Sequence, residues 1–282
     1  METLVLNFLN GLSFGAVLFL LASGLSLVLG LMGILNLAHG ALFLFGAYVG
    51  ISVNKTGANF LLSALLGGVA GAAIGLIMER VFLRHLRGLI LEQVLISFGF
   101  IYVLTNLANW IWGTTTQIVA SPISGSLVIG DIHFPNYRLL LVVIGLVVAS
   151  GLYFFDRSRI GAMVRAGMDN PEMTGGLGIN LTLVSTGVFG LGSFLAGFAG
   201  ILGVPIFGAY PEIALDVLNL ALIVVVVGGT GSIQGALAAS LFLGLLDSFG
   251  KAFFPGLASF SIYIALIVIL LFRPAGLFGR RT

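Results

Sequence analysis

Charged side chains are scarce in this sequence of 282 residues, where Lys, Arg, Asp and Glu together make up only 8%. An ordinary soluble domain carries about 25%. Hydrophobic residues make up 59%, and they fall into apolar stretches of about twenty residues, the length of a helix that crosses a bilayer. The connections between the stretches are too short to hold a soluble domain. The composition therefore excludes a soluble protein and predicts one membrane domain, residues 1–282.

Cysteine is absent, which excludes disulfides and thiolate metal sites. The net charge of +2 does not suggest nucleic acid as a partner, because the basic residues lie at the ends of apolar stretches. The sequence also lacks a Ser-His-Asp spacing, a metal-ligand cluster and a chain of ionisable residues across the stretches. These absences argue against an enzyme and against a proton relay or voltage sensor. Energy for transport is expected to come from another subunit.

The apolar stretches predict an all-α, polytopic helical bundle with eight or nine spans. The first stretch has no basic residue before it, so we expect it to remain as a helix rather than to be a cleaved signal. The second is interrupted and is expected to be broken or re-entrant. The predicted helices cover residues 4–29, 33–53, 60–84, 89–112, 138–155, 181–207, 217–230, 233–254 and 259–273.

Loop charges predict the orientation of the bundle. Three regions hold nine of the twelve Lys and Arg residues, so they are expected on the cytoplasmic side together with the C-terminus. The connections 113–137 and 208–216 carry acidic residues without Lys or Arg and are expected outside. Nine crossings place the N-terminus outside, and a re-entrant second segment places it inside. The nine basic residues are Arg80, Arg84, Arg87, Arg157, Arg159, Arg165, Arg273, Arg280 and Arg281.

Glycine is abundant, with 41 residues. Gly67, Gly71 and Gly75 recur every four residues and therefore share one face of their helix. Such a face lets a second helix approach closely.

The segment Gly30–Gly40 interrupts an apolar run with two glycines, Asn36 and His39. Polar groups at membrane depth are costly unless they face a cavity or a partner in the protein. Broken helices of this kind hold solute sites in transporters. Asn36 and His39 are therefore candidate pathway residues; the alternative is that they cap a helix or tie two helices together.

A second glycine-rich segment, Gly228–Leu237, follows the seventh predicted helix. It lacks the Gly-Lys-Ser/Thr of a phosphate-binding loop and the spacing of a dinucleotide fingerprint. Its Gln234-Gly-Ala-Leu resembles His39-Gly-Ala-Leu, which suggests corresponding positions in two structural halves. Ser232 and Gln234 are therefore also candidate pathway residues.

The connection 156–180 is too long for a tight turn and too regular for disorder. Pro171 and Gly175-Gly176 divide it into short pieces with helical patterning around Met163. Amphipathic helices at the cytoplasmic face can bind a membrane surface or a partner. The alternative is a solvated loop that only follows the charge rule.

Four ordered motifs resemble the permease family of branched-chain amino-acid ABC importers, and together they span almost the whole chain. The first is Gly33-Ile-Leu-Asn36-Leu-Ala-His39-Gly40, followed by Gly46-Ala-Tyr48. The second lies in the 156–180 connection, where the family has its cytoplasmic coupling segment. The third is Gly228-Gly-Thr-Gly-Ser232-Ile-Gln-Gly235, and the fourth is Arg273-Pro-Ala-Gly276-Leu-Phe-Gly279.

The resemblance implies a non-enzymatic subunit of a bacterial inner membrane, similar to the shorter of the two usual permeases and without a bound cofactor. Its partners would be a second permease (a homologue or a second copy), two cytoplasmic ATPases that use ATP, an extracytoplasmic solute-binding protein and membrane lipid. The ATPases would clamp on the coupling segment and rock the helices. The implied coupling residues are Gly161, Arg165, Ala166, Asp169, Asn170, Glu172 and Gly178.

One departure from the family concerns the cargo. Many amino-acid members carry an acidic residue after the His-Gly pair, whereas this sequence has Ala41. Branched-chain amino acids, urea, short amides and aromatic acids therefore all stay open as cargo. The alternative function is an autonomous channel or a secondary transporter.

Overall fold

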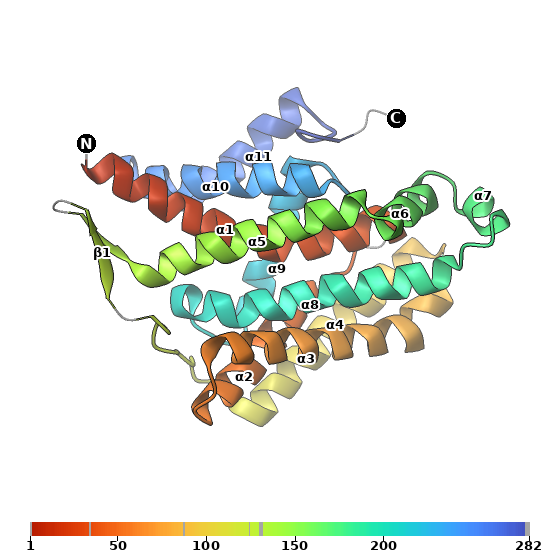
Figure 1. Ribbon diagram of the computed structural model, residues 1–282, viewed down its shortest axis with the longest axis horizontal. Helices are drawn as coiled ribbons and strands as arrows, with labels where there is room; N and C mark the ends of the chain where they lie inside the picture. The colour runs from red at the N-terminus through yellow and green to blue at the C-terminus, as the bar shows by residue number, and fades with distance from the viewer. Residues whose placement is uncertain (1, 34, 87, 124, 130–131, 280–282) are drawn as a thin grey trace.

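The computed structural model describes residues 2–33, 35–86, 88–123, 125–129 and 132–279. Helices occupy all nine predicted ranges within these residues, and the all-α, polytopic prediction is confirmed (Figure 1). These helices are α1 (Glu2–Met32), α2 (His39–Lys55), α3 (Phe60–Val81), α4 (Ile90–Trp112), α5 (Asn136–Arg157), α8 (Leu181–Phe207), α9 (Ile213–Gly228), α10 (Ile233–Phe253) and α11 (Ser261–Phe272). Shorter helices are η1 (Leu83–Leu86), α6 (Arg159–Asp169), α7 (Pro171–Gly176) and η2 (Pro255–Phe260).

Helix length separates two groups among the apolar helices. In the described residues, 6 helices are long and apolar enough to cross a membrane: α1, α3, α4, α5, α8 and α10. The helices α2, α9 and α11 have 17, 16 and 12 residues, which is shorter than the roughly twenty that a complete helical span needs. The chain is thus a multi-pass membrane protein.

The bundle has two distinct ends (Figure 1). The N-terminus of α1 lies at the hairpin end, beside the strands β1 (Ser126–Ile129) and β2 (Ile132–Pro135), where Ser248 of α10 donates to the Asn7 carbonyl at 2.7 Å. The helices α6 and α7 lie at the opposite end, the α6–α7 end. The C-terminal segment returns to this second end, because the N–H of Leu277 donates to the Val227 carbonyl at 2.8 Å.

The connection 113–137, predicted as a polar loop, contains an antiparallel hairpin in which Ser126 pairs with Pro135. Gln117 forms a further bridge with Ala209, in the connection after α8. The two connections predicted outside therefore meet at one end of the bundle. Asp131, the acidic residue of the hairpin, lies outside the described residues, as do Arg87, Arg280 and Arg281 among the predicted cytoplasmic cations.

Close helix approach at the glycine face of α3 is confirmed. A Cβ added to Gly67 would lie 2.5 Å from the Gly46 carbonyl oxygen of α2, and one added to Gly71 would lie 2.6 Å from the Ser193 oxygen of α8. The side chain of Ser193 occupies the space beside Gly75. Gly67 and Gly71 therefore let α2, α3 and α8 pack backbone to backbone.

The second apolar stretch was predicted to be helical from residue 33, but α2 begins only at His39. Gly33 has a φ of +62°, a left-handed conformation that ends α1 and that glycine adopts without steric cost. The helix then runs to Lys55, whose Nζ donates to Gln117 at the hairpin end at 2.8 Å. The stretch is therefore broken near its start, and it traverses the bundle instead of turning back.

Candidate functional site

The break between α1 and α2 places a short non-helical segment inside the bundle. The Asn36 side chain accepts from the N–H of Ala38 at 3.1 Å, and the Oγ of Ser97 in α4 accepts from the N–H of Leu37 at 3.1 Å. Backbone groups at membrane depth must find partners inside the protein. Ser97 supplies one of them from a helix that is distant in sequence, so the break is a built feature of the fold.

His39 begins α2 in the interior of the bundle. Its Nε2 lies 2.9 Å from the Leu21 carbonyl oxygen of α1. A Cβ added to Gly24, one turn further along α1, would lie 3.1 Å from the His39 ring and 2.5 Å from the Gly192 oxygen of α8. The imidazole is therefore enclosed between the central parts of α1 and α8, and it is fully buried.

Two polar atoms at this break have no hydrogen-bond partner among the described residues: Nδ2 of Asn36 and Nδ1 of His39. Both side chains are 0% exposed. A buried polar atom without a partner costs about 1–3 kcal/mol, so such atoms are rare without a functional reason. Asn36 and His39 thus offer a donor and a ring nitrogen that a passing solute could use.

Ser232 and Gln234 lie at the start of α10. The Ser232 Oγ accepts from the N–H of Gly235 at 2.9 Å and caps the helix. Gln234 is exposed at the α6–α7 end, whereas its counterpart His39 is enclosed. Both four-residue motifs begin helices that run toward the hairpin end, but their polar side chains face different surroundings.

The 156–180 connection folds into α6 and α7. Ser158 caps α6 by accepting from Gly161, and Asn170 caps α7 by accepting from the N–H of Met173 at 3.0 Å. Arg165 forms an ion pair with Asp156 at 2.7 Å and also donates to the Asp156 carbonyl, which fixes α6 against the end of α5. Of the other predicted coupling residues, Ala166 is half-buried, whereas Asp169, Glu172 and Gly178, with a φ of +82°, are exposed.

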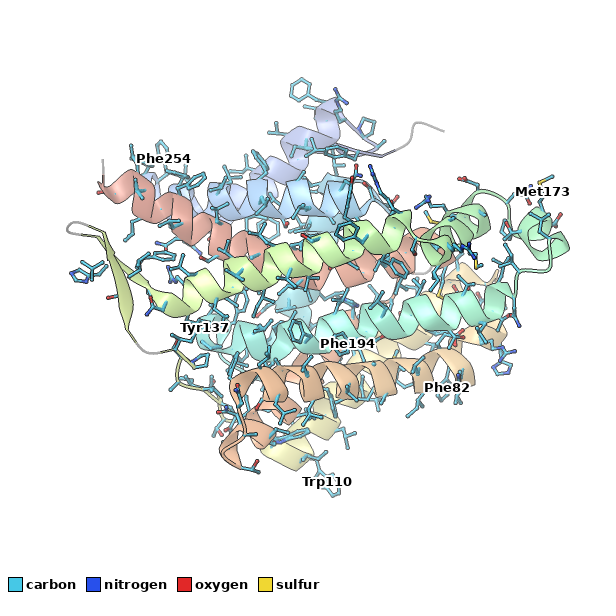
Figure 2. All side chains as sticks on the ribbon, in the orientation of Figure 1. Phe82, Trp110, Tyr137, Met173, Phe194 and Phe254 are labelled. Carbon is cyan, nitrogen blue, oxygen red and sulfur yellow. The ribbon has the colours of Figure 1, made fainter. Side chains whose placement is uncertain are left out.

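Large apolar side chains are exposed on and beside α7. Met173 is 70% and Leu177 76% exposed, and Met173 projects away from the bundle at its far end (Figure 2). The neighbouring residues Glu172 and Asn180 are polar and exposed, so this surface is amphipathic. An apolar patch with a polar border is typical of a protein or membrane contact.

Three of the motifs singled out in the sequence meet at the α6–α7 end. A Cβ added to Gly30 of α1 would lie 2.6 Å from the Cα of Gly231, which precedes α10. The Cε of Met168 in α6 would lie 3.2 Å from a Cβ at either glycine. Ser26 of α1 donates to the Ser232 carbonyl at 3.5 Å. The interrupted segment Gly30–Gly40 and the glycine-rich segment Gly228–Leu237 therefore touch through their backbones, and the 156–180 connection covers the junction.

The fourth motif joins the same junction. The N–H groups of Leu277 and Phe278 donate to the carbonyl oxygens of Val227 and Gly228 at 2.8 and 3.0 Å. These carbonyls lie at the end of α9, where they have no partner within the helix. The C-terminal segment is therefore a backbone cap of α9.

Comparison with known proteins identifies the family of the chain. Residues 7–272 match the family described as the permease component of the branched-chain amino acid transport system. The chain belongs to this family. The match includes the break at Gly33–His39, the 156–180 connection and the glycine-rich segment before α10, so the resemblance read from the motifs is confirmed.

Curated relatives cover almost the full length of the permease. It is 30% identical to BraD, a high-affinity branched-chain amino acid transport permease of Pseudomonas aeruginosa, over 96% of this chain and 94% of the relative. It is 29% identical to LivH of Escherichia coli K12, with the same coverage. A solved structure, PsaBC of Streptococcus pneumoniae in complex with Fab, shares the fold with a TM-score of 0.53 at 12% identity, over 93% of this chain and 89% of that one.

Two residues at these sites were missed in the sequence. Ser97 lies in the first half of α4 and looks like a small helix residue, and Met168 looks like part of the apolar face of α6. Only contacts between segments far apart in the sequence give them their positions.

Proposed function

We propose that this permease forms the membrane pathway of an ATP-driven importer for branched-chain amino acids or a related small polar solute. The observation that carries the proposal is the junction of Gly30, Gly231 and Met168, which links an exposed helical surface to two interrupted segments of the bundle. A transmembrane subunit that receives motion from a partner needs such a link. An autonomous channel has no use for it.

The partners follow from the same surfaces and from the family. Two cytoplasmic ATPases, a second permease and an extracytoplasmic solute-binding protein complete the importer. The amphipathic surface around Met173 and Leu177 is the contact for one ATPase, because its exposed apolar area needs a protein cover. The 156–180 connection is thus the coupling segment of one membrane domain, residues 1–282.

The orientation in a bacterial inner membrane follows from the charges. The described cations Arg80, Arg84, Arg157, Arg159 and Arg273 belong to segments at the α6–α7 end, so this end faces the cytoplasm. The C-terminus is then cytoplasmic and the N-terminus outside. Nine membrane crossings, the second of them broken at Gly33–Ala38, give an outside N-terminus and a cytoplasmic C-terminus.

Coupling proceeds through α6. Closure of the ATPases displaces α7 and α6, and the Arg165–Asp156 pair transmits that displacement to α5. Met168 transmits it to α1 and to the start of α10. The interior break then moves relative to α8, which opens the surroundings of Asn36 and His39 to the solute. Ser232 and Gln234 line the cytoplasmic exit.

Reconstitution into liposomes tests the proposal. Uptake of radiolabelled leucine is expected only when the two ATPases, the second permease, the binding protein and ATP are all present. Omission of any one component is expected to abolish it. Uptake by this chain alone, down a gradient and without ATP, would instead establish the autonomous channel and refute the importer.

A further inference from the structure

A cavity of about 640 Å³ opens at the hairpin end, away from the motifs described above. Its volume lies within the usual range for small-molecule sites, roughly 300–1,000 Å³. Six helices contribute to its wall: α1, α5, α8, α9, α10 and α11. Its polar lining includes Asn7, Asn10, Arg138, Asp247 and Lys251.

Charges of both signs face this cavity. Asp247 and Lys251 of α10 form an ion pair of 2.6 Å through the Oδ2 atom of Asp247. Arg138, in the first turn of α5, donates to the Asn10 side chain of α1. No other hydrogen bond of the Arg138 guanidinium or of Asp247 Oδ1 is present among the described residues. A guanidinium has five N–H donors and a carboxylate about four acceptor positions, so both groups keep capacity for a ligand.

Apolar side chains also line the cavity. Ile206 and Phe207 end α8, Leu220 comes from α9 and Ile262 from α11. The ring centroid of Phe14 lies 5.5 Å from the Lys251 ammonium. The cavity therefore presents both charged and apolar groups to the same ligand.

Two observations separate this cavity from an ordinary polar helix end. The Asp247 side chain is only 12% exposed. An ion pair between residues four apart can form on the exposed surface of a helix, so the pair with Lys251 does not require a buried carboxylate. Asn7 is 9% exposed, and its buried Nδ2 has no hydrogen-bond partner among the described residues. Buried ionisable groups in a membrane protein are costly and mark functional sites. The unpartnered amide adds a donor without a structural role.

We propose that this cavity binds the solute within the permease on the outer side, through the head group of an amino acid. The ligand ammonium pairs with Asp247, and its carboxylate pairs with Arg138 and Lys251, so the resident Asp247–Lys251 ion pair is exchanged for three pairs with the ligand. The apolar side chain of the ligand packs against Ile206, Leu220 and Ile262. This inference rests on the proposed function and assigns solute recognition to a residue set that excludes Asn36 and His39.

Equilibrium dialysis tests the site directly, on the importer complex purified without its solute-binding protein. The probes are leucine, isocaproate, which lacks the ammonium, and isoamylamine, which lacks the carboxylate. Loss of one charge-assisted hydrogen bond lowers affinity by about tenfold. Asp247→Asn is expected to weaken leucine and isoamylamine by this factor and to leave isocaproate unchanged. Arg138→Gln is expected to weaken leucine and isocaproate and to spare isoamylamine.

Asp216→Asn is the matched control, because Asp216 is an exposed carboxylate at the start of α9 that does not line the cavity. It is expected to leave binding of all three probes unchanged. Equal weakening of the three probes by Asp247→Asn and Arg138→Gln would indicate a structural effect and overturn the site. So would the absence of leucine binding to the unmodified complex.

A second measurement does not depend on the variants folding. A ligand that binds the folded state raises the Tm, so leucine is expected to raise the Tm of the unmodified complex, and urea is not. Equal shifts by leucine and urea would contradict recognition of a charged head group. Failure of the two hypotheses is distinguishable: ATP-driven leucine uptake with no Tm shift refutes only the cavity, whereas a Tm shift without uptake in the complete system refutes only the importer.

Discussion

Gly30 and Gly231 lie in direct backbone contact although 201 positions separate them in the sequence: a Cβ on Gly30 would lie 2.6 Å from the Cα of Gly231. This contact joins the end of α1 to the start of α10 without an intervening side chain. Met168 of α6 covers both glycines. A displacement of α6 therefore reaches two helices at one point.

Gly30→Ala is expected to impair transport at this point. Alanine is favoured over glycine in a helix interior by roughly 0.5–1 kcal/mol, but here its methyl group would press against the Gly231 backbone and Met168. The expected result is a lower rate of ATP-driven uptake with normal membrane insertion. Gly187→Ala is the control, because a Cβ at Gly187 of α8 meets no atom within 4 Å. Equal uptake rates for the two variants would remove the junction from the coupling path.

The crossing of α3 and α8 allows a prediction about stability. A Cβ on Gly71 would lie 2.6 Å from the Ser193 oxygen and 3.1 Å from the Cα of Gly197. Overpacking of this kind costs about 1–3 kcal/mol, so Gly71→Ala is expected to lower the Tm of the detergent-purified protein. Gly99→Ala in α4, where a Cβ meets no atom within 4 Å, is expected to keep or raise it. A Tm for Gly71→Ala at or above the wild-type value would contradict the backbone packing.

A variant of the Arg165–Asp156 ion pair can test the coupling role without changing the stability of the protein. The two side chains are 43% and 41% exposed, and exposed pairs contribute about 0–1 kcal/mol. Arg165→Glu is therefore expected to leave insertion and Tm nearly unchanged while it abolishes uptake, because α6 no longer moves with α5. Arg159→Glu makes the same charge change on an exposed residue of α6 and is expected to retain uptake. If Arg165→Glu transports normally and still binds the ATPases, the coupling role is wrong.

The positions of the helices could be predicted from the sequence because each apolar stretch carries its own signal. The start of α2 could not, since the helical pattern continues through Gly33 and Asn36 and only the left-handed backbone at Gly33 ends α1. The antiparallel hairpin was also missed. Its strands have four residues each, too few for a clear alternation of polar and apolar positions.

The functional residues also differ in whether the local sequence reveals them. Asn36 was recognisable because an amide interrupts an apolar run, and its buried, partly unpaired state agrees with that signal. The cavity at the hairpin end was not recognisable, because Asn7, Arg138 and Asp247 come from three helices far apart in the chain. The sequence showed only that Asp247 and Lys251 are four residues apart, which indicated an ion pair within one helix. Whether Asn36, His39, Ser232 and Gln234 line the pathway stays a prediction.

The absence of cysteine makes the orientation directly testable. A single cysteine at Ser121, exposed in the connection at the hairpin end, would be the only thiol of the chain. In intact cells it is expected to react with a membrane-impermeant maleimide. A cysteine at Gly176, exposed on α7 at the other end, is expected to react only after the membrane is opened. Labelling of Gly176→Cys but not Ser121→Cys in intact cells would reverse the proposed orientation.

Asn36 provides the sharpest test of the interior pathway. Its Nδ2 makes no hydrogen bond to a described residue, whereas its Oδ1 accepts one from the N–H of Ala38. Ser97 stabilises the same break through the N–H of Leu37 but comes from α4. Loss of either accepted bond costs about 1 kcal/mol, so Asn36→Ala and Ser97→Ala are expected to lower the Tm by similar amounts.

Uptake is expected to distinguish the two variants. If Asn36 contacts the moving solute, Asn36→Ala lowers the rate of leucine uptake much further than Ser97→Ala does, at equal amounts of assembled complex and equal ATP hydrolysis. The comparison is made at saturating binding protein, so that delivery of the solute does not limit the rate. Equal uptake by the two variants would mean that Asn36 only shapes the break, and the unpaired amide would then have no part in the pathway.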